Sequence, residues 1–440
     1  VFINYDETRF EHELADFGSI LVIRTPRDID VIAPYIEWKR EKGFTVYEEE
    51  VATGTNVTSL VSTQYTAHND ILYVQLVGDW ADIQGPTTGS APADPNLGCV
   101  VGADAYPDLI VGRFCANNTT HVTTQVNKTI TYEKTPEMGA AWYETATGIA
   151  SNQGPGDDGE LDYEHLDVIW NDKLDPFTYE TYYPIYDPAA NPTMVANALN
   201  TGTGIINYTG HGWYTYWGSS NFSNSHIANL TNGDMLPFIV SVACLNGAFH
   251  STECFAEAWL HKENGGAVGM YASTISQSWN PPMRGQDYFN DLLIGGYDYS
   301  LHPGQNGITT DVQKTTYGAL CFNGSILMTV EEYSGGQSEM EAWTVFGDAA
   351  LQVRTAPPAL LTLSNQVVLM DVDFTTIITA NGSPVEGVLI CLSQDGNYFS
   401  GVTDEFGSVT ISHALIAGDA KMVVTAFNAE TIYDDITVIP

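Results

Sequence analysis

Two residues in the middle of the chain have the chemical types needed for covalent catalysis. His211 lies between two glycines in Asn207-Tyr208-Thr209-Gly210-His211-Gly212, and Cys244 directly follows the apolar residues 237–243. A cysteine thiolate attacks a carbonyl carbon, and a nearby imidazole then protonates the leaving group. The pair therefore suggests a cysteine nucleophile with a histidine partner. A buried core thiol and an unrelated loop histidine are the alternative, and residue types alone do not decide between the two.

This chemistry requires a fold that brings both residues to one place. Residues 204–208 and 237–243 are apolar runs of strand length, and they end just before His211 and Cys244. In an open α/β sheet, ligands bind beyond the carboxyl ends of the strands. We therefore expect two adjacent strands to carry the imidazole and the thiol to the same edge of a sheet.

The first 354 residues alternate strand-like and helix-like segments, which is typical of a parallel sheet flanked by helices. Strands are expected at 18–23, 71–77, 109–111, 148–151, 204–208, 237–243 and 267–271. Helices are expected over 27–43, 163–174, 254–262 and 315–332. We divide this part into two α/β subdomains, residues 1–140 and 141–354.

The pattern changes after the Thr355-Ala356-Pro357-Pro358 segment. Short alternating apolar runs follow, separated by turn residues, and no convincing helix is present. This pattern predicts an all-β sandwich of immunoglobulin-like size over residues 355–440.

Composition excludes several classes of function. The chain has 440 residues, with 54 Asp and Glu against 15 Lys and Arg, so its formal charge is −39. Nucleic acids and anionic membranes are therefore excluded as partners, because both are bound through clustered basic residues. A hydrophobic content of 44% excludes acidic disorder. No apolar run reaches the roughly 20 residues that span a bilayer.

The six cysteines form no CxxC pair, so a structural zinc site is not expected. Cys99 and Cys115 are either bridged or two free thiols.

The chain resembles the gingipains, which are caspase-like cysteine endopeptidases, through several motifs in the same order. These motifs are 207–212, Val242-Ala243-Cys244-Leu245-Asn246-Gly247, Cys254-Phe255-Ala256-Glu257-Ala258, 272–279, Pro282-Met283-Arg284-Gly285-Gln286-Asp287 and Thr344-Val345-Phe346-Gly347-Asp348. The resemblance implies two caspase-like subdomains followed by an immunoglobulin-like domain.

The resemblance also implies the catalytic roles. Cys244 becomes the nucleophile, His211 the general acid, and the backbone N–H groups of Gly212 and Cys244 the oxyanion hole. Where the family has an acidic residue supporting the histidine, this chain has Gln153. A neutral amide can orient an imidazole but stabilises imidazolium less well than a carboxylate does.

The substrate preference is inferred from residues 159–165, which resemble the arginine-specific members. Asp162 falls where their pocket carboxylate lies, so Arg is expected before the scissile bond, with Lys second. Taken alone, Asp162 reads instead as the N-cap of the following helix. The resemblance implies that the pocket walls are formed by Thr209, Val242, Gln277, Trp279 and Met283.

Calcium is the expected cofactor. Asp79 ends a predicted strand, and Asp104, Tyr106 and Asp108 alternate in a Gly-rich loop, as oxygen ligands of Ca²⁺ often do. The family binds structural calcium at matching positions, and the resemblance adds Phe249, Glu257, Asp287 and Asp291 as ligands. Solvated acidic loops are the alternative at this charge density.

The combined expectation is a secreted or surface endopeptidase that cleaves proteins or peptides after Arg and acts as a monomer. A chain beginning at Val1 fits a zymogen that has already been cut. Three alternatives stay open: a gingipain-related sorting transpeptidase, a catalytically inactive binding scaffold, and a caspase-like enzyme that cleaves after Asp. The negative charge of Asp162 speaks against the last, because it would repel an acidic substrate side chain.

Overall fold

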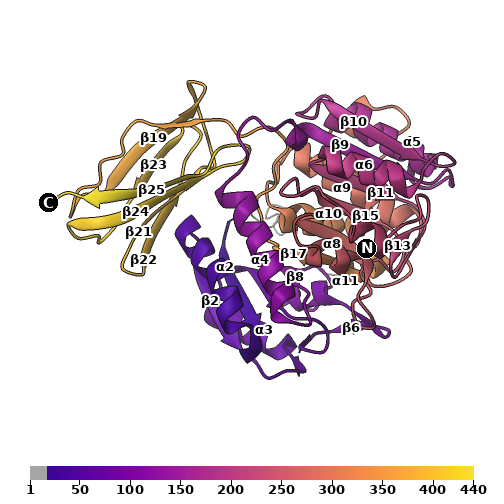
Figure 1. The fold of residues 1–440 in the computed structure, drawn as a ribbon, viewed down its shortest axis with the longest axis horizontal. Helices are drawn as coiled ribbons and strands as arrows, with labels where there is room; N and C mark the ends of the chain where they lie inside the picture. Colours follow the sequence, from indigo (N-terminus) through magenta and orange to yellow (C-terminus); the bar gives the residue numbers. More distant parts are fainter. Residues whose placement is uncertain (1–16) are drawn as a thin grey trace.

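A single ten-stranded sheet organises the first 354 residues of the computed structural model, which describes residues 17–440. Its strand order is β10-β9-β11-β15-β16-β17-β8-β4-β1-β2 (Figure 1). The strands are β1 (Ser19–Arg24), β2 (Val46–Glu50), β4 (Ile71–Val77), β8 (Ile110–Phe114), β9 (Thr145–Ala150), β10 (Thr181–Tyr186), β11 (Ile205–Thr209), β15 (Phe238–Val242), β16 (Gly269–Ser273) and β17 (Trp343–Gly347).

The two halves of the sheet meet at β17. This strand is antiparallel to β16 but parallel to β8, and the other neighbouring strands pair in parallel. The strands of the first half therefore run opposite to those of the second. The predicted α/β architecture is confirmed, and β17 joins the strands of both parts, residues 17–140 and 141–354, into one sheet.

Helices flank this sheet (Figure 1). They are α2 (Ile29–Lys42), α3 (Thr58–Ala67), α4 (Thr119–Lys134), α5 (Asp162–Val168), α6 (Pro192–Thr201), α7 (Asn224–Ile227), α8 (Phe255–His261), α9 (Asn280–Ile294), α10 (Tyr317–Glu332) and α11 (Ser334–Ala342). A π-helical turn, Ile169–Leu174, continues α5. Helix α2 ends where Gly43 takes φ = +115°, a left-handed conformation that favours glycine.

Apolar side chains cover both faces of the central strands. In β15, Phe238, Val240 and Val242 belong to one core cluster and Ile239 to another. Strands buried on both faces read as continuous apolar runs, which explains why the sequence revealed them so clearly. The same burial leaves their carboxyl ends as the places where polar residues gather.

Residues from 361 onward form two antiparallel sheets. One has the order β18-β19-β20, with β23 also paired to β19, and the other has the order β22-β21-β24-β25. The strands are β18 (Leu361–Leu363), β19 (Phe374–Ala380), β20 (Ser383–Pro384), β21 (Leu389–Gln394), β22 (Asn397–Val402), β23 (Ser408–Ile411), β24 (Gly418–Thr425) and β25 (Ile432–Val438). Side chains from both sheets, including Phe374, Ile378, Ile390 and Val424, share one apolar core, so this part is a β-sandwich.

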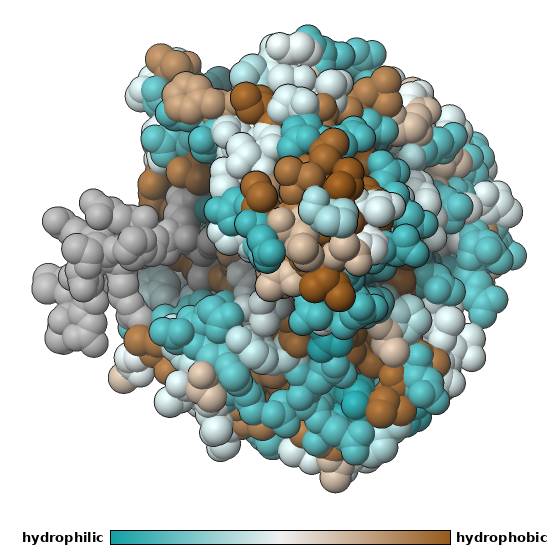
Figure 2. Space-filling model, turned by 90° about the vertical axis from the view of Figure 1, so that its left-hand side faces the viewer, coloured by the Kyte–Doolittle hydropathy of each residue, from teal (hydrophilic) through white to brown (hydrophobic). Residues whose placement is uncertain are grey.

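The sandwich packs against α2 of the α/β part. The Tyr433 hydroxyl donates to Glu41 Oε1 at 2.6 Å, and Arg354 Nη1 donates to the Ala429 carbonyl at 2.5 Å. Figure 2 views the molecule from the end at which the sandwich lies and shows a patch of hydrophobic (brown) residues among polar ones. Exposed apolar residues of the sandwich include Val367, Val372 and Ile439. Among residues 17–440, no helix is long and apolar enough to cross a bilayer.

Candidate active site

The register of β11 and β15 brings the His211 and Cys244 segments together. Thr209 pairs with Val242, and Gly210 N–H donates to the Val242 carbonyl at 3.1 Å. His211 and Cys244 each follow this pair by two residues. A Cβ atom on Gly212 would lie 2.7 Å from the Cys244 carbonyl oxygen, so the two loops are in backbone contact and only glycine fits there.

Asn246 clamps the histidine loop to the cysteine loop. Its buried Nδ2 donates to the carbonyls of Trp213 at 2.7 Å and Tyr216 at 3.2 Å, while its Oδ1 accepts from Ser241 Oγ at 3.1 Å. We did not assign a role to Asn246 from the sequence. A polar residue two positions after Cys244 was the available signal, but the two backbone carbonyls that it binds lie 33 and 30 residues earlier.

Gln153 lies against the imidazole of His211. Its Oε1 is 3.0 Å from His211 Nε2, and the Trp279 ring meets the imidazole edge to face at 5.3 Å between centroids. An amide oxygen accepts only, so Nε2 carries the proton in neutral His211. Nδ1 is then the ring nitrogen that carries the lone pair.

Cys244 is half-buried at the same edge. Its Sγ lies 3.7 Å from the Gln277 carbonyl oxygen, and Gln277 Oε1 accepts from Ala243 N–H at 2.8 Å. Burial raises the pKa of the Cys244 thiol above its ordinary value. The thiol is therefore protonated at neutral pH and needs a base to become a nucleophile.

Asp162 is fully buried at the first position of α5. Ser151 Oγ donates to its Oδ2, and Trp279 Nε1 donates to its Oδ1 at 3.1 Å. The N-cap interpretation is wrong, because the helix begins one residue earlier than expected and Leu161 is the N-cap. Burial raises the pKa of Asp162 to about 6. An ionised carboxylate offers about four acceptor sites, so two are left for a cationic ligand.

Other residues expected in the pocket lie around Trp279. A Cβ atom on Gly156 would be 2.7 Å from Trp279 Cδ1, so Gly156 lies directly against this ring, beside buried Met283. Thr209 is buried and its Oγ1 donates to Gln286 Oε1 at 2.7 Å. Val242 is buried at the end of β15. Of the elements that carry these residues, α9 reaches Asp162 through Trp279 at its N-terminus, and β11 packs against α5, which carries Asp162.

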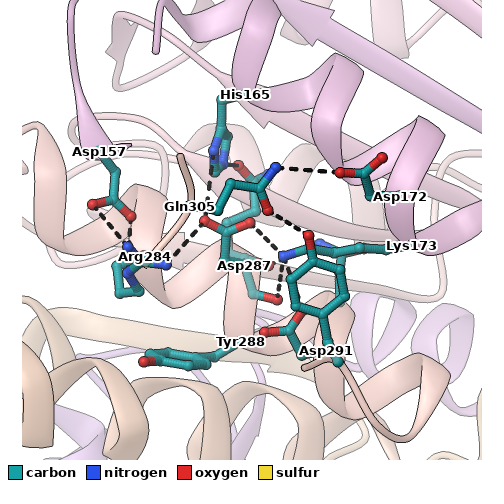
Figure 3. Close-up of polar contacts among 12 residues, drawn as sticks. Asp157, His165, Asp172, Lys173, Arg284, Asp287, Tyr288, Asp291 and Gln305 are labelled. Carbon is teal, nitrogen blue, oxygen red and sulfur yellow. Dashed lines mark hydrogen bonds and ion pairs between the residues drawn. The ribbon is translucent and has the colours of Figure 1, made fainter. Parts of the chain in front are cut away.

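A buried ionic network supports this region from behind, with Lys173 and Arg284 on either side of Asp287 (Figure 3). Lys173 Nζ lies 2.5 Å from Asp287 Oδ1 and 2.8 Å from Asp291 Oδ1. Arg284 Nε lies 3.0 Å from Asp157 Oδ2. The network ties α9 to the π-helical turn and to the 154–159 loop.

The same network changes the interpretation of the acidic residues. Asp287 and Asp291 do not fit a calcium site, because the Lys173 ammonium lies between their carboxylates. Glu257 is buried and accepts from Cys254 N–H at 2.7 Å and from Cys115 Sγ at 3.2 Å. Phe249 packs its ring 4.8 Å from the Arg113 guanidinium.

The remaining expected calcium ligands lie in two loops. Asp79 Oδ1 accepts from Ala81 N–H at 2.8 Å. Asp108 Oδ2 accepts from Val101 N–H at 2.8 Å, and Asp104 Oδ1 accepts from Tyr106 N–H at 3.1 Å. Each of these carboxylates thus has one oxygen engaged by the backbone of its own loop.

All six cysteines are free thiols. Cys99 and Cys115 are therefore not bridged, which settles the alternative that the sequence left open.

Comparisons with known proteins identify the family to which this chain belongs. The model of peptidase family C25 matches residues 16–354. The chain belongs to this family. It is 34% identical to gingipain R2 of Porphyromonas gingivalis over 462 residues, covering 100% of this chain and 60% of that protein. It is 24% identical to the Lys-gingipain of the same species, covering 89% of this chain and 24% of that one.

Among solved structures, the Arg-specific cysteine proteinase gingipain R superposes with a TM-score of 0.87 at 32% identity, covering 96% of this C25 chain and 98% of the other. The complex of RgpB pro- and mature domains gives a TM-score of 0.86 at 31% identity, covering 96% and 100%. The predicted resemblance to the gingipains is confirmed. The chain spans 44% of the length of one gingipain R1 sequence and 60% of the length of one gingipain R2 sequence.

Proposed function

We propose that this protein is an endopeptidase that cleaves peptide bonds after Arg, with Lys as the second choice. The observation that carries the proposal is the shared strand edge on which His211, Cys244 and the Asp162 pocket meet. Trp279 connects the parts, because it binds Asp162 through Nε1 and contacts His211 through its ring.

The reaction begins with proton transfer from Cys244 to Nδ1 of His211. The thiolate attacks the scissile carbonyl, and the resulting oxyanion is held by the backbone N–H groups of Gly212 and Cys244. When the C–N bond breaks, imidazolium returns its proton to the departing amine and a thioester remains. Water, deprotonated by His211, then hydrolyses the thioester and regenerates the thiol.

Gln153 would act as the positioning residue for this histidine. Its Oε1 holds Nε2–H at 3.0 Å, which keeps Nδ1 in the acceptor form that the thiol requires. Because the amide carries no charge, it raises the proton affinity of the imidazole less than a carboxylate would. The imidazolium is therefore a stronger acid toward the leaving amine.

Specificity for Arg would come from the Asp162 carboxylate. A planar guanidinium can form two parallel charge-assisted hydrogen bonds with a carboxylate, whereas the Lys ammonium binds as a point charge. A neutral substrate side chain would leave the buried carboxylate without a partner, and this penalty provides discrimination. The guanidinium stem would pass along the Trp279 ring.

A fluorogenic peptide screen tests this proposal. Peptides with Arg, Lys, Asp or Ala before the scissile bond are compared on the wild type and on Cys244→Ala. Arg should give the highest kcat/KM, and Cys244→Ala should abolish turnover. Turnover that survives in the variant would overturn the mechanism, and equal rates for Arg and Ala would remove Asp162 from the specificity pocket.

We further propose calcium as a structural cofactor in the loop that carries Asp104, Tyr106 and Asp108. Ca²⁺ binds roughly six to eight oxygen atoms, and carboxylates spaced along one loop can provide several of them. Saturating CaCl₂ should raise the melting temperature over that in EGTA, and Asp104→Asn should reduce this rise. An identical melting temperature in CaCl₂ and EGTA would contradict the site.

By its resemblance to the gingipains, we also propose that the protein acts as a monomer outside the cell or at its surface. We propose in addition that the C-terminal sandwich is immunoglobulin-like. Two antiparallel sheets packed around one apolar core support this last proposal.

A further inference from the structure

Three metal-ligating side chains converge at a place that the proposed peptidase reaction does not use. His121 lies in the first turn of α4, Glu253 precedes α8, and His261 is the last residue of α8. One ligand atom from each lies within 4.8 Å of the others. Over residues 17–440, this is the one group of three or more His, Cys, Asp or Glu side chains close enough to hold a metal ion.

The buried histidine of this group is oriented as metal ligands usually are. His261 Nε2 is 2.8 Å from the Cys115 carbonyl oxygen, and His261 Nδ1 is 2.8 Å from Glu253 Oε1. A metal-bound imidazole commonly donates its second N–H to a backbone carbonyl, which fixes the ring and its tautomer. The Cys115 carbonyl provides this support, so Nδ1 faces the centre of the group.

A ring nitrogen of His121, Nδ1, lies at the same position. This nitrogen is buried and has no hydrogen-bond partner within the described part of the chain. Leaving a buried polar atom unpaired destabilises the folded protein. The imidazoles of His121 and His261 stack with centroids 3.6 Å apart, so two protonated rings would repel each other strongly. A shared cation would give His121 Nδ1 a partner and would take the place of the proton between His261 Nδ1 and Glu253 Oε1.

The surrounding structure holds these side chains in place without a metal. Asn118 caps α4 by accepting from His121 N–H at 3.0 Å. Gln125 Nε2 donates to the Cys115 carbonyl at 2.8 Å, and Lys128 Nζ donates to the carbonyls of Trp259 at 2.9 Å and Leu260 at 3.0 Å. These contacts fix the last turn of α8 against α4.

We propose that His121, Glu253 and His261 bind one zinc-class divalent transition-metal ion, with water completing the coordination. Two imidazoles and a carboxylate suit Zn²⁺, which prefers four ligands with nitrogen among them. Ca²⁺ prefers an all-oxygen shell. The site is therefore distinct in chemistry from the calcium loop proposed above.

The position of the site predicts its effect. His121 belongs to the first half of the chain, while Glu253 and His261 belong to the second. A bound ion would cross-link α4 to the segment that runs from the nucleophile Cys244 into α8. Because the ion binds the folded state, it should raise the melting temperature as its concentration rises.

Isothermal titration with ZnCl₂ tests the site in Cys244→Ala protein, which lacks the reactive thiol that would also bind Zn²⁺. The protein is stripped with EDTA and then kept in saturating CaCl₂, so that calcium sites do not contribute. One equivalent of Zn²⁺ should bind with a micromolar or tighter Kd. Co²⁺ should give visible absorption bands that Zn²⁺ removes.

Two further substitutions decide whether these residues are the ligands. His121→Ala and Glu253→Gln should each weaken Zn²⁺ binding at least about tenfold, whereas His68→Ala, a histidine stacked on Tyr47 away from the group, should not. Circular dichroism checks that each variant folds. Because Glu253 is exposed, Glu253→Gln still tests the site if His121→Ala does not fold. Absence of binding up to about 1 mM Zn²⁺, or equal affinity in all variants, would overturn the proposal.

Discussion

Asp162→Asn should weaken catalysis but stabilise the fold. The substitution keeps the shape of the side chain, and an amide can still accept from Trp279 Nε1 and bond to Ser151 Oγ. It removes the negative charge that the proposed Arg substrate requires. It also removes a carboxylate whose ionisation is unfavourable in the folded protein.

The size of the stabilisation follows from the pKa of Asp162. Burial raises this pKa from 3.8 to about 6. The corresponding free energy is about 3 kcal/mol, at about 1.36 kcal/mol for each tenfold change in proton affinity. Relaxation of the protein around the buried charge reduces the expected gain to about 2 kcal/mol.

The sign depends on pH. Between pH 3.8 and about 6 the folded protein holds a proton on Asp162 that the unfolded chain has lost, so wild-type stability falls as pH rises through this window. The Asn variant lacks this loss. Its free energy of unfolding relative to wild type should be near zero at about pH 4 and about 2 kcal/mol higher at about pH 8.

Urea unfolding at both pH values measures the stability difference, and Arg-peptide hydrolysis measures the catalytic loss. Removal of a buried charged partner should lower kcat/KM for Arg about a hundredfold or more. Exposed Asp175, changed to Asn, is the matched control and should alter neither quantity. A stability gain independent of pH, or a loss of Arg turnover below about tenfold, would refute the reasoning.

Three other substitutions test neighbouring contacts. Gln153→Ala removes the acceptor for His211 Nε2 and should lower kcat/KM about tenfold to a hundredfold at unchanged melting temperature; an unchanged rate would contradict a positioning role. Asn246→Ala loses three hydrogen bonds and should reduce the free energy of unfolding by about 2–3 kcal/mol in urea titrations; a loss under about 1 kcal/mol would count against the clamp. Lys173→Met removes the ion-pair partner of Asp291 and the nearest cation to Asp287, and it should cost about 3–5 kcal/mol, with partial recovery on adding Asp287→Asn. Failure of that recovery would show that charge is not the cause.

The helices show how far sequence patterns reach. Helices α8 and α10 match their predicted ranges within two residues at each end. Helix α9 was missed, because Pro281 and Pro282 read as helix breakers although proline is favoured in a first helical turn. Helix α4 was also missed, since its many threonines have low helix propensity. Both helices form because the fold buries them, α9 at every position from Pro282 to Leu293 and α4 along one side.

The sequence by itself determined the candidate catalytic pair. His211 and Cys244 follow buried strands whose apolar runs are unmistakable, and the carboxyl ends of adjacent parallel strands must meet at one edge. Fold class and family followed from such local signals. Each of these features depends on residues close together in the sequence, so it can be recognised without knowing which distant residues are in contact.

Only the tertiary structure decided which partner each charged or polar group takes. Asp287 forms an ion pair with Lys173, 114 residues earlier, although the resemblance suggested that Asp287 binds calcium. His121 meets His261 across the two halves of the chain. With 54 acidic residues, composition offers many candidate partners for any cation. The packing of the helices decides which carboxylates lie within ion-pair distance of each cation, and burial makes the loss of such a pair costly.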